Sequence, residues 1–125
     1  MRIVIVGNGL AGTMAGKTVR ELDPEAEIEI LGEERYPYYP RPNLIEYLAG
    51  RLPYEKLFAF PQGWTERQRI ALRLGEKVVR IRPAERQIET ASGDTRGYDA
   101  LLLATGARAA VPPVPGIDRK GVFVL

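Results

Sequence analysis

Three glycines near the amino terminus, Gly7, Gly9 and Gly12, have the spacing of a turn that binds phosphate through its backbone. In such a turn the first glycine allows a tight bend out of a strand, and the second lets a diphosphate approach the main chain. The third lets a helix pack closely on the strand. The ligand then meets the free N–H groups and the positive end of that helix. This turn, which includes Leu10 and Ala11, is the first predicted site, and a flexible glycine-rich loop is the alternative.

The elements needed to position this turn surround it in the sequence. Residues 2–6 are a short β-branched run that predicts a strand buried in a parallel sheet. Residues 13–22 have apolar and small side chains at helical spacing, and residues 27–31 alternate as a strand does. Strand, turn, helix and strand in this order predict a βαβ unit, which favours dinucleotide binding over a flexible loop.

An acidic residue is expected about 20 residues after the glycines, where its carboxylate accepts hydrogen bonds from a ribose hydroxyl. Glu33 stands there, just past the second strand, and the adjacent Glu34 is the alternative. An acid at this position disfavours the 2′-phosphate of NADP at this site. It does not distinguish FAD from NAD.

The rest of the chain is less regular. Prolines in residues 36–42 predict an extended segment, after which Asn43 is expected to cap a short helix that ends at Gly50. Residues 51–63 are expected to be irregular and residues 64–70 to form a short helix.

The last half of the chain is predicted to be rich in strands. Strands are expected at residues 77–82, with Val79 and Ile81 on one face, and at 86–90 and 95–98, which together form an antiparallel meander. Residues 100–104 predict a further buried parallel strand. The remainder, residues 107–125, carries prolines and ends on an apolar run over residues 122–125.

Composition limits the chemistry. The chain has 125 residues, 45% of them hydrophobic and 27% charged, which suits one folded domain. The net charge of +2 gives no reason to expect a nucleic-acid partner. Cysteine and histidine are absent, so chemistry here would come from a cofactor or another chain. No apolar run suits a signal peptide or a membrane span, and a cytoplasmic protein is expected.

Three stretches together resemble a known family. They are the glycine turn, the segment 39–50 with its Tyr-Pro-Arg-Pro-Asn-Leu sequence, and the segment 98–108 with its Ala-Thr-Gly sequence, which Pro-Val-Pro-Gly follows at 113–116. The chain resembles the N-terminal part of FAD-dependent pyridine nucleotide oxidoreductases. It is most similar to the branch without a redox disulfide, which includes rubredoxin reductases, ferredoxin reductases and the large subunit of NAD(P)H nitrite reductase.

The resemblance implies further contacts with FAD. Arg41 and Pro42 would lie near the flavin, where a cation stabilises the negative charge of the reduced ring. Taken without the resemblance, Arg41 is better explained as an arginine in a proline-rich surface loop. Val79 would lie against the adenine, which is compatible with a strand residue that faces the core.

A second group of residues follows the strand predicted at 100–104. Ligands of open α/β sheets collect where parallel strands end. The resemblance therefore implies contacts from Ala104, Thr105 and Gly106, and from Arg108, which as an exposed arginine is the weaker candidate.

The chain departs from the family in two respects. Many relatives carry a lysine close to the flavin where Glu46 stands here, and a carboxylate there would oppose negative charge on a reduced flavin. The resemblance also implies that residues 1–125 are only the first segment of an FAD-binding domain. The NAD domain, its glycine fingerprint and the C-terminal domain of the family are not found in these residues.

The expected fold is α/β: a Rossmann-like FAD/NAD(P)-binding domain with a parallel sheet, helices and a small antiparallel meander. The expected function, in an intact enzyme, is electron transfer from NAD(P)H through FAD to an acceptor. The alternatives are an NAD- or ADP-binding Rossmann module, a non-enzymatic subunit, and a relic that binds nothing. An incomplete flavin domain would expose apolar surface, so a homo-oligomer or a complementary chain is expected as a partner.

Overall fold

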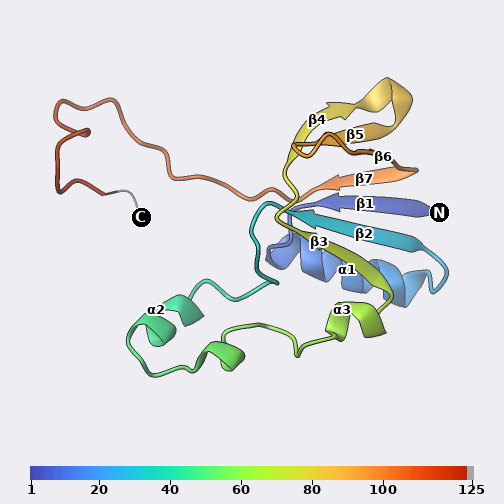
Figure 1. Ribbon diagram of the computed structural model, residues 1–125, viewed down its shortest axis with the longest axis horizontal. Helices are drawn as coiled ribbons and strands as arrows, with labels where there is room; N and C mark the ends of the chain where they lie inside the picture. Colours follow the sequence, from blue (N-terminus) through green and yellow to red (C-terminus); the bar gives the residue numbers. More distant parts are fainter. Residues whose placement is uncertain (124–125) are drawn as a thin grey trace.

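A parallel sheet forms the centre of the molecule in the computed structural model, which describes residues 1–123 (Figure 1). Its four strands lie in the order β3-β2-β1-β7. Their bounds are Arg2–Val6 for β1, Glu27–Gly32 for β2, Ile70–Leu74 for β3 and Ala100–Leu103 for β7. All neighbouring pairs are parallel, so the carboxyl ends of the strands meet at one edge of the sheet. The parallel sheet predicted from the sequence is confirmed.

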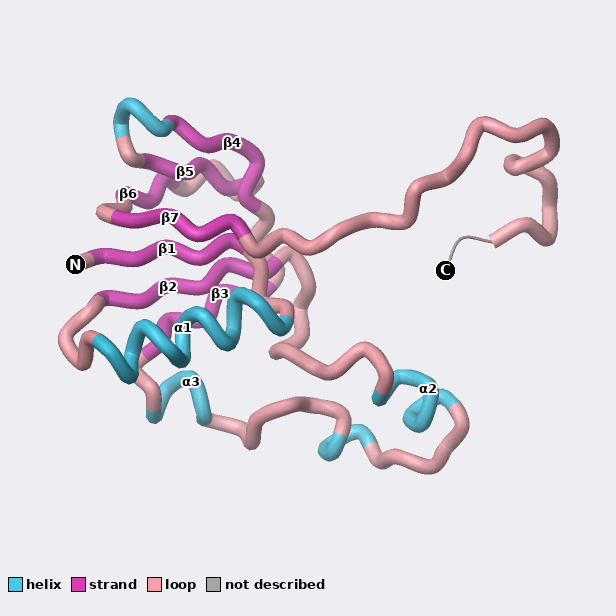
Figure 2. The backbone as a smooth tube through the Cα atoms, turned by 180° about the vertical axis from the view of Figure 1, so that it is seen from behind, coloured by secondary structure: helices cyan, strands magenta, loops and turns pink. Residues whose placement is uncertain are grey.

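Helix α1, Leu10–Leu22, covers one face of this sheet (Figure 2). It begins three residues earlier than predicted, because Gly9 already accepts the first helical hydrogen bond from the Thr13 amide at 3.0 Å. The second half of the glycine turn is therefore the first turn of the helix. A Cβ at Gly16 would lie 2.9 Å from the Ile30 Cδ1, so the missing side chain lets α1 approach the sheet.

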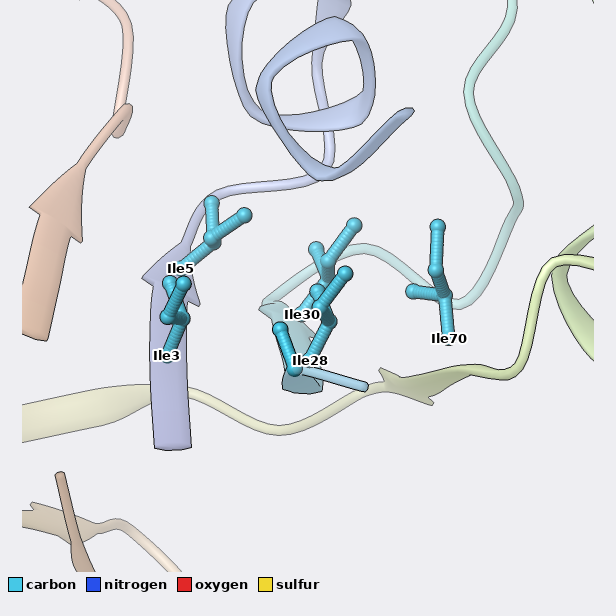
Figure 3. Packing of buried hydrophobic residues seen from close by; sticks show 6 residues of the cluster. Ile3, Ile5, Ile28, Ile30 and Ile70 are labelled. Atoms are coloured by element: carbon cyan, nitrogen blue, oxygen red, sulfur yellow. The ribbon is translucent and has the colours of Figure 1, made fainter. Parts of the chain in front are cut away.

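Isoleucines fill the space between α1 and the sheet. Ile3 and Ile5 from β1, Ile28 and Ile30 from β2, and Ile70 from β3 point toward the helix (Figure 3). All five are buried, as the alternation of side chains along a strand requires for one covered face. Burial of each such side chain contributes about 1.5–3 kcal/mol to folding, so this layer holds α1 and the turn before it in place.

An antiparallel meander covers the other face. It consists of β4 (Val78–Arg82), β5 (Gln87–Thr90) and β6 (Thr95–Gly97), in that order. Ile88 of β5 packs on Val4 and Leu31, which are the residues of β1 and β2 that point away from α1. The α/β fold with a small antiparallel meander is confirmed.

The helix predicted for residues 64–70 is wrong in its second half. Helix α3 covers only Trp64–Arg67, and Arg69 with a φ of 51° turns the chain into β3. The side chains of β3 alternate between more buried and exposed, and Ile70 faces the core. The prediction missed this strand because it is short and follows α3 almost directly.

The prediction that Val79 and Ile81 share a face is also wrong. The pairing of β4 with β5 shifts register between Val78 and Arg80, as a β-bulge does. Val78 and Ile81 consequently pack on the inner cluster, while Val79 is 53% exposed.

Two further expectations need correction. Leu102 and Leu103 of β7 are exposed, because β7 has only β1 beside it in the described part of the chain. Helix α2, Asn43–Leu48, takes Pro42 as its cap residue, so Asn43 is the first helical residue rather than the cap. The predicted end of this helix is consistent with Gly50, which has a φ of +71°.

Two segments extend beyond the layered body (Figure 1). One runs from the end of β2 through α2 and a 3₁₀ turn at Tyr54–Lys56 to α3. The other follows β7 as irregular chain. The apolar run expected at residues 122–125 lies partly outside the described residues, which end at 123. Within that range, no helix is long and apolar enough to cross a membrane.

Candidate functional site

A cleft of about 1090 Å³ lies at the edge where the strands of the parallel sheet end. Its walls are the ends of β1, β2 and β7, the segment 36–42 and residues 76–78. Most of the predicted site residues line it: Gly7, Gly9, Leu10, Glu33, Glu34, Arg41, Pro42, Ala104, Thr105, Gly106 and Arg108. Ala11, Gly12 and Val79 do not. The fold thus brings the three separated stretches of sequence to one place.

Gly7 and Gly12 allow close contacts within the glycine turn. Gly7 has a φ of +110°, and a Cβ there would collide with the Ala104 carbonyl at the end of β7. Its amide donates to the Leu31 carbonyl at 2.7 Å. Gly12 is buried, and a Cβ there would collide with the Gly7 carbonyl and lie 3.2 Å from the Ile5 Cγ2. Both glycines therefore fix the shape of the turn, and Gly7 also lines the cleft.

Gly9 is different because the space beside it is open. A Cβ built there meets no atom within 4 Å, and its backbone is extended, with a φ of −72°. Gly9 is the N-cap residue of α1 and has no side chain that could block the approach to the first amides of the helix. An open approach to the N-terminus of a 13-residue helix suits an anionic diphosphate.

Asn8 connects the glycine turn to the loop after β2. Its Nδ2 donates to the Tyr36 carbonyl at 2.8 Å, and its backbone carbonyl accepts from the Thr13 hydroxyl at 3.1 Å. A Cβ at Gly32 would lie 2.5 Å from the Asn8 Oδ1, so this contact needs a glycine there. Asn8 was not among the predicted site residues, although a short amide side chain between two turn glycines is of a type that forms hydrogen bonds to nearby backbone.

Glu33 lies in the loop after β2 between two cations. Lys77 Nζ donates to its Oε1 at 2.9 Å, and the nearest Arg108 nitrogen is 4.0 Å from its Oε2. The hydrogen bond and charge of Lys77 lower the pKa of Glu33 below its usual value, with a smaller contribution from Arg108. Glu33 is therefore ionised at neutral pH and able to accept hydrogen bonds. Lys77 was missed because it was assigned to a strand without regard to the cleft.

Glu34 makes a different set of contacts. Its Oε1 accepts from Arg41 at 2.6 Å and its Oε2 accepts from the Tyr39 hydroxyl at 2.8 Å. Arg41 also donates to the Tyr39 oxygen at 3.1 Å. Both oxygens of Glu34 are thus engaged by the segment 36–42.

At the meander side of the cleft the structure places Val78 rather than Val79. Because of the β-bulge, the exposed Val79 side chain lies away from the cleft, and the half-buried Val78 lines it. An apolar contact to an adenine is available from Val78.

Comparison with known proteins identifies the family of this chain. The family model described as pyridine nucleotide-disulphide oxidoreductase matches residues 1–125. The chain belongs to this family. It is 38% identical over 124 residues to the ferredoxin–NAD(+) reductase component of the biphenyl dioxygenase system of Paraburkholderia xenovorans. It is 35% identical over 123 residues to the assimilatory nitrate reductase electron transfer subunit of Bacillus subtilis.

Solved structures of this pyridine nucleotide-disulphide oxidoreductase family have the same fold. The reductase in the covalent putidaredoxin reductase–putidaredoxin complex is 33% identical, with a TM-score of 0.83 over 90% of this chain. The matches cover 27% of that reductase chain, 30% of the Paraburkholderia protein and 16% of the Bacillus subunit. The chain therefore spans less than a third of these relatives. FAD is the cofactor of the family.

Glu46, which stands where the family resemblance leads us to expect a lysine, forms an ion pair with a neighbouring arginine. Arg51 donates from Nε at 2.6 Å and from a terminal nitrogen at 2.9 Å to the two oxygens of Glu46. This hydrogen bonding lowers the pKa of Glu46 and raises that of Arg51. Glu46 is not among the residues that line the cleft. The charge of Glu46 is therefore balanced locally by Arg51.

Proposed function

We propose that residues 1–125 form the first segment of the FAD-binding domain of an NAD(P)H-dependent flavin oxidoreductase. In this proposal the intact enzyme moves electrons from NAD(P)H through FAD to an acceptor, and segments outside these residues bind NAD(P)H and complete the flavin site. Membership of the family and the names of the relatives support this reading.

The observation that carries the proposal is the shape of the cleft beside Gly9. The approach to the first amides of α1 is open, while neighbouring Gly7 and Gly12 are tightly packed and keep the turn in one conformation. A Cβ at Gly9 would project into free space that a diphosphate can fill. The charges of the cleft side chains balance, because Arg41, Lys77 and Arg108 are matched by Glu33, Glu34 and Glu76. The amides at the start of α1 therefore supply the attraction for a diphosphate.

The residues present therefore fit an ADP-containing cofactor. The amides at the start of α1 would bind the diphosphate, and Glu33 would accept hydrogen bonds from the adenosine ribose. Val78 would contact the adenine. Arg41, Pro42 and the residues after β7 would lie along the remainder of the ligand. When bound, FAD supplies acceptance of a hydride and release of one or two electrons, and the chain binds and orients it.

The assignment of the ribose acceptor favours Glu33 over Glu34. One oxygen of Glu33 is held by Lys77, whereas the nearest cation to its other oxygen is Arg108 at 4.0 Å. Both oxygens of Glu34 already accept strong hydrogen bonds. A ribose hydroxyl can therefore reach Glu33 without breaking an existing pair.

Equilibrium titration of the purified chain with FAD, ADP and NAD tests the proposal. Saturable binding with FAD preferred is the expected result. Similar affinity for all three ligands would favour the alternative of an ADP- or NAD-binding module, because recognition would then lie in the shared ADP half. Failure to bind any of them would contradict a nucleotide site within these residues.

The location and assembly of the protein are also part of this proposal. Leu102 and Leu103 belong to β7, the outermost strand of the parallel sheet within residues 1–123, and are 40% and 57% exposed, which supports self-association or pairing with a complementary segment. Sedimentation at several protein concentrations would detect self-association. We place the intact enzyme in the cytoplasm, and fractionation of cells that express it would test this.

A further inference from the structure

Glu34, Tyr39 and Arg41 form a closed ring of hydrogen bonds on the wall of the cleft. Glu34 accepts from Arg41 at 2.6 Å and from the Tyr39 hydroxyl at 2.8 Å, and Arg41 donates to the same hydroxyl oxygen at 3.1 Å. The Arg41 guanidinium carbon also lies 5.2 Å from the centre of the Tyr39 ring. Each member of the ring contacts both others, so the position of any one depends on the other two.

The Tyr39 hydroxyl suits the bridging position. Partial burial raises the pKa of this phenol, and the neighbouring Glu34 carboxylate raises it further. The hydroxyl therefore stays protonated and donates to Glu34, while its oxygen accepts from Arg41.

The backbone of Arg41 is fixed as well as its side chain. Pro40 and Pro42 flank it, and each has a restricted φ. The Asn43 amide donates to the Pro40 carbonyl at 2.9 Å and the Leu44 amide donates to the Arg41 carbonyl at 3.1 Å, which joins the segment to α2. Arg41 is thus held at its main chain by prolines and at its guanidinium by Glu34 and Tyr39.

This double restraint has no evident role in stabilising the fold. The side chains of Arg41 and Glu34 are 71% and 42% exposed, and pairs of this kind add little to stability. A restraint of this kind matters for binding, since a side chain that is already ordered loses less entropy when a ligand arrives.

We propose that Glu34 and Tyr39 are positioning residues that preorganise Arg41 for the anionic cofactor of this cleft. The inference rests on the proposed function and deepens it by giving Glu33 and Glu34, the two acids after β2, different roles. Glu33 is the ribose acceptor, and Glu34 acts on the ligand only through Arg41.

Tyr39→Phe is the sharpest probe, because it opens the ring without changing the net charge or removing the aromatic face beneath Arg41. We expect the affinity of the chain for FAD to fall roughly three- to tenfold. The matched control is Tyr47→Phe, a tyrosine of α2 outside the cleft, which should leave FAD affinity unchanged. Thermal unfolding of the ligand-free variants should match that of the original chain.

A double-mutant cycle separates positioning from a general structural effect. In an Arg41→Ala background, Tyr39→Phe and Glu34→Gln should each produce no further change in FAD affinity, since the residue that they position is gone. Effects that persist unchanged in that background would overturn the inference while leaving FAD binding intact. Failure of the original chain to bind FAD would overturn both this inference and the proposed function.

Discussion

The glycine turn and the segment 36–42 form two walls of one cleft by opposite means. The turn works through its backbone, and its shape depends on side chains that are absent, since a Cβ at Gly7 or Gly12 would collide with main-chain atoms. The segment 36–42 works through side chains, whose exposed polar groups bond to one another. Substitutions in the turn should therefore cause large losses of stability or FAD affinity through steric overlap. Substitutions in the segment 36–42 should reduce FAD affinity by smaller amounts.

The largest effect is expected for Gly12→Val. Its side chain would overlap the Gly7 carbonyl and push α1 away from Ile5. Neither the Gly7 backbone nor the buried isoleucine layer can move easily to make room. The free energy of unfolding should therefore fall by about 3 kcal/mol. Denaturant titration followed by circular dichroism measures this. Near-normal stability would show that α1 shifts without cost. Gly9→Ala, at the open position three residues before Gly12, is the control.

Gly9→Val should separate binding from folding in the same turn. The backbone at Gly9 is extended and its surroundings are open, so the fold should survive. The branched side chain would occupy the path of the diphosphate, and we expect FAD affinity to fall about a hundredfold, or about 2.7 kcal/mol. Fluorescence titration of FAD together with an unfolding curve tests both halves. Unchanged affinity would remove the glycine turn from the site.

Glu33→Gln should have a smaller effect, because one neutral acceptor remains for the ribose. About a tenfold loss of affinity for FAD and ADP alike is expected, since a charged hydrogen bond is replaced by a neutral one. Glu34→Gln provides the comparison, as it should not weaken binding when Arg41 is absent. Equal losses for Glu33→Gln and Glu34→Gln in the Arg41→Ala background would contradict the division of tasks.

The pH dependence of ligand affinity at Glu33 follows from the direction in which its pKa is shifted. Its pKa in the folded chain is lowered below 4.5, so the pairing with Lys77 stabilises the fold above that value. This contribution is lost as the pH falls through the lowered pKa. Ligand affinity at Glu33 should accordingly be flat between about pH 5 and pH 8 and decline only in stronger acid. NMR titration of the Glu33 carboxyl carbon would measure the shift, and a midpoint above 4.5 would contradict it.

The smallest effect is expected at Glu46. It is exposed, paired with Arg51 and outside the cleft, so Glu46→Gln should leave both FAD affinity and the unfolding midpoint unchanged. Calorimetry on Glu46→Gln and Arg51→Gln checks this. A clear change in FAD affinity for Glu46→Gln alone would mean that this carboxylate does reach the ligand.

The sequence was sufficient for features that depend on local pattern. The βαβ unit and the meander follow from period and glycine spacing, and the meeting of the glycine turn with the residues after β7 follows from the geometry of parallel strands. The placement of Arg41 and Pro42 beside them came only from the family resemblance. Strand β3 was missed even though its apolar residues Ile70, Leu72 and Leu74 alternate, because only two residues separate it from the end of α3. The placement of Val79 failed because a β-bulge reverses the faces of a strand and leaves no mark in the pattern of apolar residues.

Contacts between polar side chains could not be predicted from the sequence. Lys77 and Glu33 are far apart in the chain and meet only because β4 begins beside the end of β2. Glu33 and Glu34 are adjacent and identical in type, so no pattern distinguishes them. Their different partners arise from the path of the loop that carries them.

The contacts of Asn8 couple the motions of the glycine turn to those of the loop after β2. Its side chain holds the Tyr36 carbonyl and packs on Gly32, while its own carbonyl receives the Thr13 hydroxyl, so one residue ties the glycine turn to the loop that carries Glu33. Segments joined in this way open as one cooperative unit in amide hydrogen exchange. A ligand that contacts only the turn should therefore slow exchange in the loop after β2 as well, and ADP and inorganic pyrophosphate should protect the same set of amides.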